Sequence, residues 1–245
     1  YCCGVLATVR SGGRQLQNAQ KRPHPSKKRR KDPTGDSQMV DLLPWGLASL
    51  RWWRRYFSLA NAPPKRFLLP RPTYPGVVQS DASGLGFGGV FSSGNTLLVF
   101  HGRWTDTEKA LIDSGKLDIN LTEMLTSYWL ITLAAKYLTG YVATIDCDNL
   151  QTVQLLHRQR SRRRSSALLL ERIDLLLAQH QLRMHWQHLP GKLNVLSDRA
   201  SRECVDELDM TFFSIANATF PLLTIKDISA ALGNRRQTHW LLQAL

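Results

Sequence analysis

The alternation of apolar and polar residues is most regular between about Tyr74 and Arg202, where it predicts a folded domain. Short runs bounded by turn residues predict strands, and longer runs with helical spacing predict helices. The strands are expected at 76–81, 86–92, 96–102, 141–147 and 182–187, the helices at 121–138, 150–157, 166–179 and 195–200, and a loop or short helix at 105–119. A three-stranded meander followed by alternating helices and strands predicts an α/β fold, with a mixed five-stranded sheet and helices on both faces.

Three further segments flank this domain. Residues 1–39 form a polar, basic, largely irregular tail that cannot build a core, and residues 203–245 are expected to form a helical extension. Residues 40–73 carry leucines and aromatics near the helical period, which predicts one amphipathic helix, ended by Asn61 and Pro63, that packs on the main domain at 74–202. Its arginines among aromatic rings would also suit base stacking, although aromatics at helical spacing more often belong to a core.

The balance of charge narrows the classes of partner. The 245 residues carry a formal net charge of +13, and the pI is near 10.0. A polyanion, most simply nucleic acid, explains this charge better than a membrane surface does. No apolar run approaches the roughly 18 residues of a spanning helix. The four cysteines lie in no metal-ligand spacing, and neither a secretion signal nor a dense cysteine framework suggests disulfides, so an intracellular, reducing compartment is expected.

Two clusters of basic residues are the expected contacts with phosphates. Like charges this close together destabilise one another unless a polyanion lies near, although solvated segments and, for the first cluster, a nuclear import signal are also open. The first cluster is Lys27, Lys28, Arg29, Arg30 and Lys31 in the tail, and the second is Arg158, Arg160, Arg162, Arg163 and Arg164 between two predicted helices, with Lys192 in a later loop.

Four acidic residues are candidates for a metal site. Asp81 stands where the first predicted strand leaves the core, before a glycine-rich turn. A single acidic residue there is usually only a turn former, but Glu123, Asp148 and Asp198 also stand at the edges of predicted elements. Gathered at one place, the four carboxylates would repel one another unless divalent cations lay between them. Asp146 competes with Asp148, because it lies two residues earlier and would point to the same face of the strand.

These acidic residues stand in motifs that resemble the ribonuclease H domain of retroelement reverse transcriptases. The order of the motifs, more than any single one, carries the resemblance. They are Ser80-Asp81-Ala-Ser-Gly-Leu-Gly-Phe-Gly-Gly89, Ile119-Asn-Leu-Thr-Glu123, Asp148-Asn149 and His188-Leu-Pro-Gly-Lys-Leu-Asn-Val-Leu-Ser-Asp-Arg-Ala-Ser-Arg202. Within that family, a Leu-Arg-Trp-Trp helix followed by Asn61 is most similar to the tyrosine-recombinase (DIRS-type) retrotransposons. The similarity covers about residues 41–240.

The resemblance implies a ribonuclease H-like fold and Mg²⁺-dependent hydrolysis of RNA in RNA/DNA hybrids. It implies two Mg²⁺ ions, for which Mn²⁺ could substitute. Asp81 would bridge both ions, Glu123 and Asp148 would hold one of them, and the other would be held by Asp198. His188 would lie on a mobile loop and assist the exchange of water or product.

Two departures from the family pattern leave these ligands in place. Cys147 stands where Thr usually precedes the strand carboxylate, and Ser197 stands where Ala usually precedes the last Asp. The polymerase signature Tyr-x-Asp-Asp is absent from this sequence, so the chain is not itself a working reverse transcriptase.

Two functions are therefore open. The first is a retroelement-derived ribonuclease H endonuclease, which would act in the nucleus. The second is a domesticated, non-catalytic RNA-binding component of a large ribonucleoprotein such as a mitochondrial ribosome, located in an organelle or the cytoplasm, with other proteins of that particle as partners. The intact carboxylate set favours the first function, and the basic tail favours the second.

Overall fold

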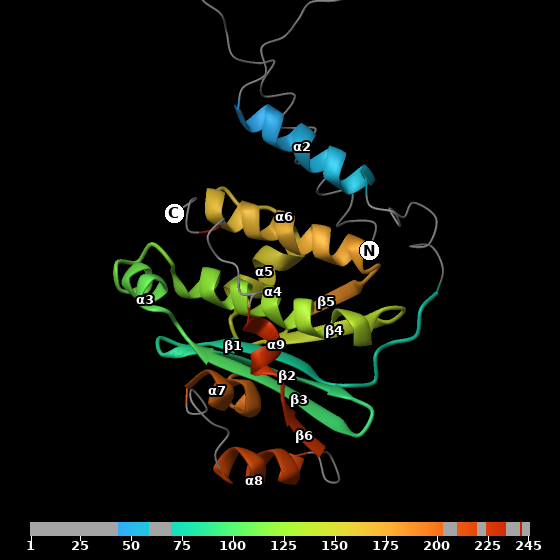
Figure 1. Cartoon of the computed structure of the whole chain (residues 1–245), viewed down its shortest axis with the longest axis vertical. Coiled ribbons are helices and arrows are strands. Elements are labelled where there is room, and N and C mark those ends of the chain that lie inside the picture. The colour runs from blue at the N-terminus through green and yellow to red at the C-terminus, as the bar shows by residue number, and fades with distance from the viewer. Residues whose placement is uncertain (1–43, 59–69, 203–209, 220–223, 234–240, 242–245) are drawn as a thin grey trace, which may run out of the picture.

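The computed structural model describes residues 44–58, 70–202, 210–219, 224–233 and 241, in which a mixed sheet lies between two layers of helices (Figure 1). The strands are β1 (Val78–Ala82), β2 (Gly86–Ser93), β3 (Thr96–Arg103), β4 (Val142–Cys147), β5 (Arg183–His188) and β6 (Thr224–Asp227). The helices are α2 (Pro44–Ser58), α3 (Asp106–Asp113), α4 (Ile119–Leu138), α5 (Leu150–Arg158), α6 (Arg164–Gln179), α7 (Val195–Arg202), α8 (Met210–Thr219) and α9 (Ser229–Leu232). The expected α/β class, with helices on both faces of a mixed sheet, is confirmed.

Strand β1 lies inside the sheet, whose order is β5-β4-β1-β2-β3-β6. The first three strands form the expected antiparallel meander, and β4 pairs with β1 in parallel, as expected. Ser80 of β1 lies opposite Cys147 of β4, and Cys147 lies opposite His188 of β5. The three parallel strands therefore end at the same edge of the sheet, which is where Asp81 and Asp148 are found.

The sheet has six strands where the sequence predicts five. The prediction of a helical C-terminal extension is wrong in part, because the extension also contains a strand. Strand β6 comes from the extension and pairs in parallel with β3, with Thr224 opposite Thr96 and Asp227 opposite Val99. Without β6, strand β3 would present unpaired backbone groups at an open edge, which natural sheets usually protect. Because β6 has only four residues, it is too short to give a clear strand periodicity in the sequence.

Helix α4 covers one face of the sheet and is hydrophobic on almost every side. It contacts β1 and β2 below, and α5 and α6 beside and above, which explains why an amphipathic stripe is missing. Trp129, near its middle, is fully buried and packs on Phe87 of β2. The helix begins two residues before its predicted start, because Asp118 caps it by accepting a hydrogen bond from the backbone N of Leu121 at 2.9 Å.

The segment predicted as a loop or short helix contains helix α3. Thr105 and Glu108 form a capping box: the Thr105 side chain accepts from the backbone N of Glu108, and the Glu108 carboxylate accepts from the backbone N of Thr105 at 2.9 Å. This reciprocal cap resolves the two alternatives in favour of the helix.

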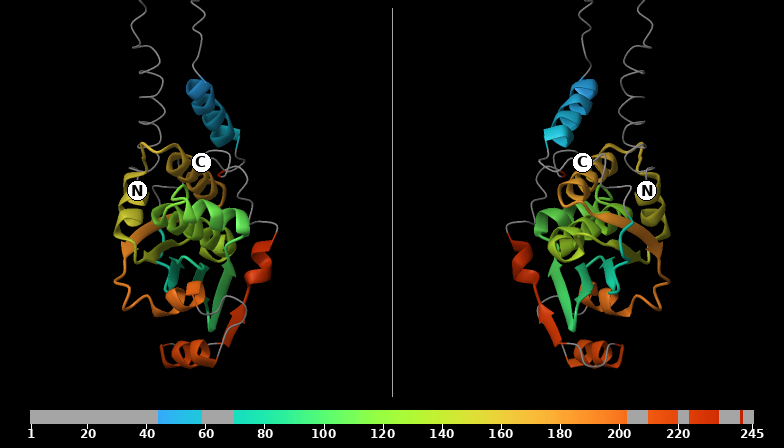
Figure 2. Two further views of the ribbon diagram at one scale, coloured as in Figure 1. Left: turned by 90° about the vertical axis from the view of Figure 1, so that its left-hand side faces the viewer. Right: turned by 90° about the vertical axis from the view of Figure 1, so that its right-hand side faces the viewer.

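Helix α7 covers the opposite face of the sheet, with α8 below it (Figures 1 and 2). Leu196 and Ala200 of α7 join Val90, Val99 and Phe212 in a second, smaller core. Helix α7 can lie close to strand β2 because β2 carries Gly88 at the point of contact. A Cβ atom at Gly88 would lie 2.5 Å from the carbonyl carbon of Ala200, closer than real Cβ contacts. The small residue therefore fixes how near α7 lies to the sheet.

Helix α2 packs on α6, as expected from its helical spacing of aromatics. Trp52 and Tyr56 are buried, stack with ring centroids 5.2 Å apart, and form a small core with Ala178. These two rings are core residues, in agreement with the simpler of the two interpretations. The predicted end of this helix at Asn61, and the basic tail, lie outside the described residues.

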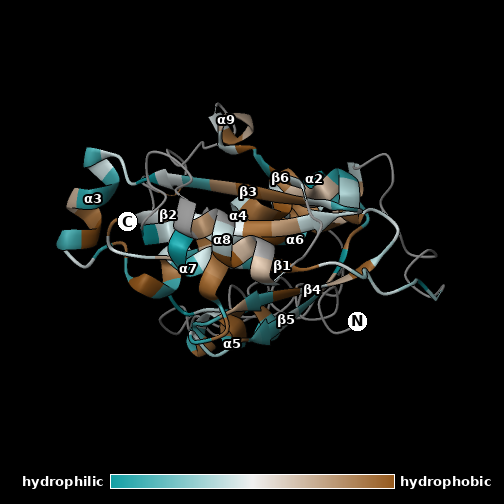
Figure 3. Ribbon diagram, turned by 90° about the horizontal axis from the view of Figure 1, so that it is seen from below, coloured by the Kyte–Doolittle hydropathy of each residue, from teal (hydrophilic) through white to brown (hydrophobic). Residues whose placement is uncertain are grey.

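Hydrophobic residues of the strands and of α4 form the main core. Helix α7 is mainly hydrophilic when the molecule is seen from below (Figure 3). Among the described residues, no helix combines the length and the apolar character needed to cross a membrane.

Replacement of Gly88 by Ala is expected to destabilise the protein by about 1–3 kcal/mol, because the new methyl group would press on the backbone of α7. Gly84→Ala is the matched control: a Cβ there meets nothing within 4 Å, so the change should stay within about 0.5 kcal/mol. Urea unfolding of the two variants measures both effects. Equal stability of the two variants would show that α7 does not depend on this close approach.

Candidate metal centre

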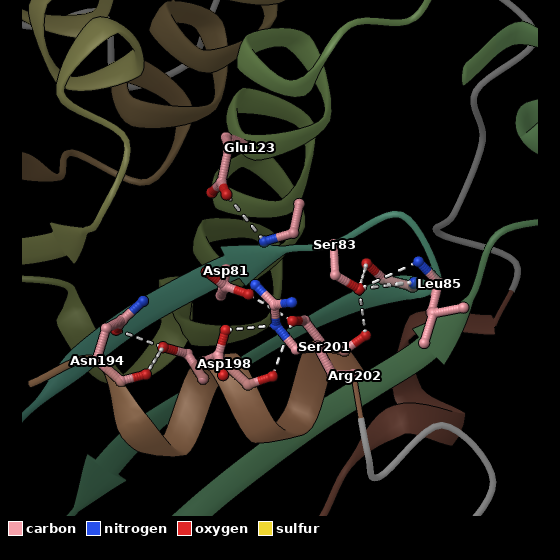
Figure 4. A network of polar contacts seen from close by, with 11 residues as sticks. Asp81, Ser83, Leu85, Glu123, Asn194, Asp198, Ser201 and Arg202 are labelled. Atoms are coloured by element: carbon pink, nitrogen blue, oxygen red, sulfur yellow. Dashed lines mark hydrogen bonds and ion pairs between the residues drawn. The ribbon is translucent and has the colours of Figure 1, made fainter. Parts of the chain in front are cut away.

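Four acidic side chains gather where β1 ends, although their residues are far apart in the sequence. Asp81 lies on β1, Glu123 on α4, Asp148 directly after β4, and Asp198 on α7. Asp81 and Glu123 are each only 2% exposed, and Asp148 is partly exposed. Figure 4 shows Glu123 above the strand and Asp198 below it, with Asp81 between them. Both helical layers thus contribute a carboxylate to one edge of the sheet.

Glu123 is held in place by the end of β1. Its Oε1 atom accepts a hydrogen bond from the backbone N of Ala82 at 3.1 Å (Figure 4). Since α4 starts earlier than predicted, Glu123 lies in the second turn of the helix and not in the first. The Cys147 thiol approaches its Oε2 atom at 3.6 Å. One ligand atom each from Glu123, Cys147 and Asp148 lie within 4.8 Å of one another, close enough to hold a metal ion.

Helix α7 supplies Asp198 and also holds Asp81. The Ser201 hydroxyl donates a hydrogen bond to Oδ2 of Asp81, and it lies 2.9 Å from the backbone O of Asp198. Arg202 binds Asp198 through its Nε atom at 2.6 Å. Ser83, just past β1, donates to the backbone O of Ser201 at 2.8 Å. These contacts join the end of β1 to the last turn of α7.

Burial, and after it the neighbouring carboxylates, raise the pKa values of three of these side chains. The pKa of Asp81 is raised to about 7 by burial and by the nearby Asp148 and Asp198, against the opposing hydrogen bond from Ser201 and the charge of Arg202. Burial, together with Asp81, raises the pKa of Glu123 well above its usual value. Burial and then Asp198 also raise the pKa of Asp148. A bound cation would relieve this repulsion.

The donor atoms suit a divalent cation. Carboxylate oxygens are the preferred ligands of Mg²⁺ and Mn²⁺. The positive charge of Arg202 acts on both Asp81 and Asp148. Asp148 and Asp198 keep partial exposure, so the cluster is open to solvent on that side. The residues present therefore fit a metal ion.

Of the two competing aspartates, Asp148 lies among the other carboxylates, whereas Asp146 has a different partner. Asp146, on β4, hydrogen-bonds to Gln79 of the neighbouring strand β1. Asp148 follows the strand, where it hydrogen-bonds to Asp81 and interacts with Asp198. The two residues do not share one environment, because the chain leaves the regular strand at Cys147.

His188 lies close to this centre, but it is the last residue of β5 and not part of the loop where it was predicted. Strand β5 extends one residue further than predicted, because His188 pairs with Cys147. The exposed His188 ring contacts the backbone O of Asp148 through Nε2 at 3.0 Å. The loop that follows also passes Asp148, since a Cβ at Gly191 would lie 3.2 Å from its Oδ2 atom. Lys192 is exposed on the same loop.

The arginine-rich stretch joins α5 to α6, but Arg158 is the last residue of α5 and Arg164 the first of α6, so only its middle members lie between the helices as predicted. Arg163 forms an ion pair with Asp118, the cap of α4, and also donates to the backbone O of Lys116. Its guanidinium anchors the stretch to the helix that carries Glu123. The exposed members are Arg158, Arg160, Arg162 and Arg164. The cluster at 27–31 lies outside the described residues.

Sequence reasoning missed Ser201, Arg202 and Cys147 as parts of this centre. Ser201 and Arg202 follow Asp198 by three and four residues, a spacing that places them on the same helical face and could have been noticed. The bond from Ser201 to Asp81 depends on how α7 packs against β1, for which the sequence carries no local signal.

Comparisons with known proteins assign no family to this chain. The chain matches no protein-family model, and a search of curated proteins gives no match.

In the metal-free protein, Asp81→Asn is expected to stabilise the fold above pH 7 and to flatten its pH dependence. Because the pKa of Asp81 is raised to about 7, the folded state retains a proton that the unfolded state loses near pH 4. This stabilisation is complete below about pH 4 and is lost as the pH rises to about 7, a loss on the order of a few kcal/mol.

Urea unfolding between pH 4 and 8 in the presence of EDTA measures this effect. Asp113→Asn is the control, because Asp113 is exposed at the end of α3, and its stability should stay within about 0.5 kcal/mol of the parent. If both variants keep the pH dependence of the parent, Asp81 does not carry the proton.

Proposed function

We propose that this chain is a metal-dependent endonuclease of the ribonuclease H type, which hydrolyses the RNA strand of RNA/DNA hybrids. The observation that carries the proposal is the gathering of Asp81, Glu123, Asp148 and Asp198 at one edge of a mixed sheet, in the order of motifs that resemble that family. The arrangement of a β-meander followed by parallel strands is compatible with a ribonuclease H-like fold.

The carboxylates would hold Mg²⁺, with Mn²⁺ as a substitute. When bound there, such ions supply an activated water and neutralise the charge that develops on the phosphate. Asp81 is suited to the central position, because it interacts with carboxylates from both layers. Glu123 of α4 and Asp148 lie close together, and Asp148 also interacts with Asp198 of α7.

The remaining residues of the centre orient these ligands. The backbone N of Ala82 fixes Glu123, and the Ser201 hydroxyl fixes one oxygen of Asp81. Arg202 restrains Asp198 while leaving its second carboxylate oxygen for an ion. His188, exposed beside Asp148, would assist the exchange of water or product at the open side of the centre.

The substrate assignment rests on charge and on the resemblance. The exposed arginines at 158, 160, 162 and 164 flank the anchor that Arg163 makes with the start of α4, so they bring positive charge towards the helix that carries Glu123. Phosphate contacts of this kind carry no base sequence, and an RNA strand would be selected through its 2′-OH groups and the shape of the duplex.

The net charge of +13 also favours a second candidate, a non-catalytic RNA-binding component of a ribonucleoprotein. That role would use the basic surface without the carboxylates. It does not account for four acidic side chains kept together at a cost in repulsion, so the nuclease is the stronger proposal.

The purified chain is expected to cleave the RNA strand of a hybrid in Mg²⁺, and Asp81→Asn or Asp148→Asn should abolish cleavage because each removes a ligand charge. Asp146→Asn is the matched control on the neighbouring position, where Gln79 is the partner, and should retain cleavage. A gel assay with labelled hybrid, compared with duplex DNA, measures this. If Asp146→Asn abolishes cleavage and Asp148→Asn does not, Asp146 is the metal ligand in place of Asp148. A parent protein that binds RNA without cleaving the hybrid would favour the second candidate.

Binding of a hybrid in the absence of divalent metal should depend steeply on salt, and the exposed arginines should account for part of the slope. Replacing Arg158, Arg160, Arg162 and Arg164 by Gln should flatten the dependence of log K on log salt by up to roughly 3–4, at about 0.9 per lost contact with duplex phosphates. Arg163→Gln is the control and should leave the slope nearly unchanged, since its guanidinium is bound to Asp118 and Lys116. Equal slopes for all three proteins would show that this stretch does not touch the nucleic acid.

A further inference from the structure

The carboxylate centre contains one ligand atom of a different chemical kind, the sulfur of Cys147. This residue ends β4 with its side chain fully buried, and its Sγ atom lies 3.6 Å from Oε2 of Glu123. The sulfur, one Glu123 oxygen and one Asp148 oxygen all lie within 4.8 Å of one another. The nuclease mechanism proposed above does not use the sulfur.

We propose that Glu123, Cys147 and Asp148 form a binding site for a thiophilic divalent cation, of the class of Zn²⁺ and Cd²⁺. The inference rests on the proposed function in one respect: this site shares Glu123 and Asp148 with the proposed Mg²⁺ site. The two sites differ in their other ligands, because the thiophilic ion uses Cys147 and does not need Asp81 or Asp198.

The spacing of the three atoms is close to what such an ion requires. Zn²⁺ binds thiolate sulfur at about 2.3 Å and carboxylate oxygen at about 2.0–2.2 Å, so two tetrahedral ligands of one ion lie roughly 3.5 Å apart. The 3.6 Å between Sγ of Cys147 and Oε2 of Glu123 meets this requirement, and the remaining separations, which lie within 4.8 Å, call for a rotation of the partly exposed Asp148 side chain towards the other two ligands. Three protein ligands leave the fourth tetrahedral position to water.

The chemistry of the ligands decides which ions benefit. A thiolate adds affinity for soft or borderline cations, whereas Mg²⁺ and Mn²⁺ prefer oxygen. As the metal–sulfur bond forms, the thiol proton passes to solvent, so the binding becomes tighter as the pH rises. Two carboxylates beside the sulfur give the site the charge to hold a dication.

Binding of a thiophilic ion at this site would affect the proposed nuclease. The ion occupies Glu123 and Asp148, so it removes two ligands from Mg²⁺ without blocking access of the nucleic acid. Zn²⁺ should then inhibit cleavage by competing with Mg²⁺, and removing the sulfur should relieve the inhibition.

Spectroscopy with Co²⁺ tests the site without reference to activity. The chain has three other cysteines, so the full-length protein is first prepared with Cys2, Cys3 and Cys204 replaced by Ser, which leaves Cys147 as its one thiol. Added Co²⁺ should give a sulfur-to-cobalt charge-transfer band that Zn²⁺ removes. The further change Cys147→Ser, which keeps a small polar side chain, should abolish the band and weaken Zn²⁺ binding by about 10- to 100-fold or more.

A charge-transfer band that is present in the protein with Cys147 as its one thiol and disappears on the further change Asp148→Asn supports the three-ligand site. This result holds whether or not the protein cleaves a hybrid. Absence of the band in the protein with Cys147 as its one thiol overturns the inference, even if Cys147→Ser fails to fold. If Mg²⁺-dependent cleavage is present and the band is absent, the proposed function stands and this site does not. Equal affinity for Zn²⁺ before and after the change Cys147→Ser, measured by calorimetry, would also overturn it.

Discussion

The repulsion between carboxylates that are buried together at the end of β1 is the constraint on which the rest of the structure depends. These side chains can be kept there only because the fold supplies fixed partners: the hydroxyl of Ser201 binds Asp81 from below, and the backbone N of Ala82 binds Glu123 above. The sheet topology makes this possible, since β1 and β4 are parallel and end together. A structure optimised for stability alone would not gather these charges, which is why the cluster indicates function.

The fold could be predicted where the pattern of residues was long enough to show a period. The meander and α4 belong to this class, as does the helix that buries Trp52. Strand β6 does not, because four residues give no clear alternation and its existence depends on the open edge of β3. Similarly, the capping box at Thr105 decides between loop and helix only once both of its hydrogen bonds are seen.

The acidic residues of the candidate site could be predicted from the sequence, but the hydrogen bonds that connect them to their neighbours could not. Asp81 and Glu123 stand in recognisable motifs, so their positions on the sheet edge and on α4 follow from local patterns. The direction of each hydrogen bond does not, because it depends on how separate elements pack. Arg163 illustrates the difference: in the sequence it is one of five similar arginines, whereas in the structure it is an anchor between two helices. Cys147 illustrates it too, since only the fold brings its sulfur beside two carboxylates.

The origin of β6 changes where this protein can be divided. The motifs end at Arg202, but the strand that covers β3 and two buried leucines of the main core, Leu232 and Leu241, come from later in the chain. A fragment cut after α7 would retain every candidate metal ligand and yet expose the backbone of β3 along a full edge, ready to pair with another copy of itself. The unit defined by the chemistry is therefore shorter than the unit that completes the sheet and its core.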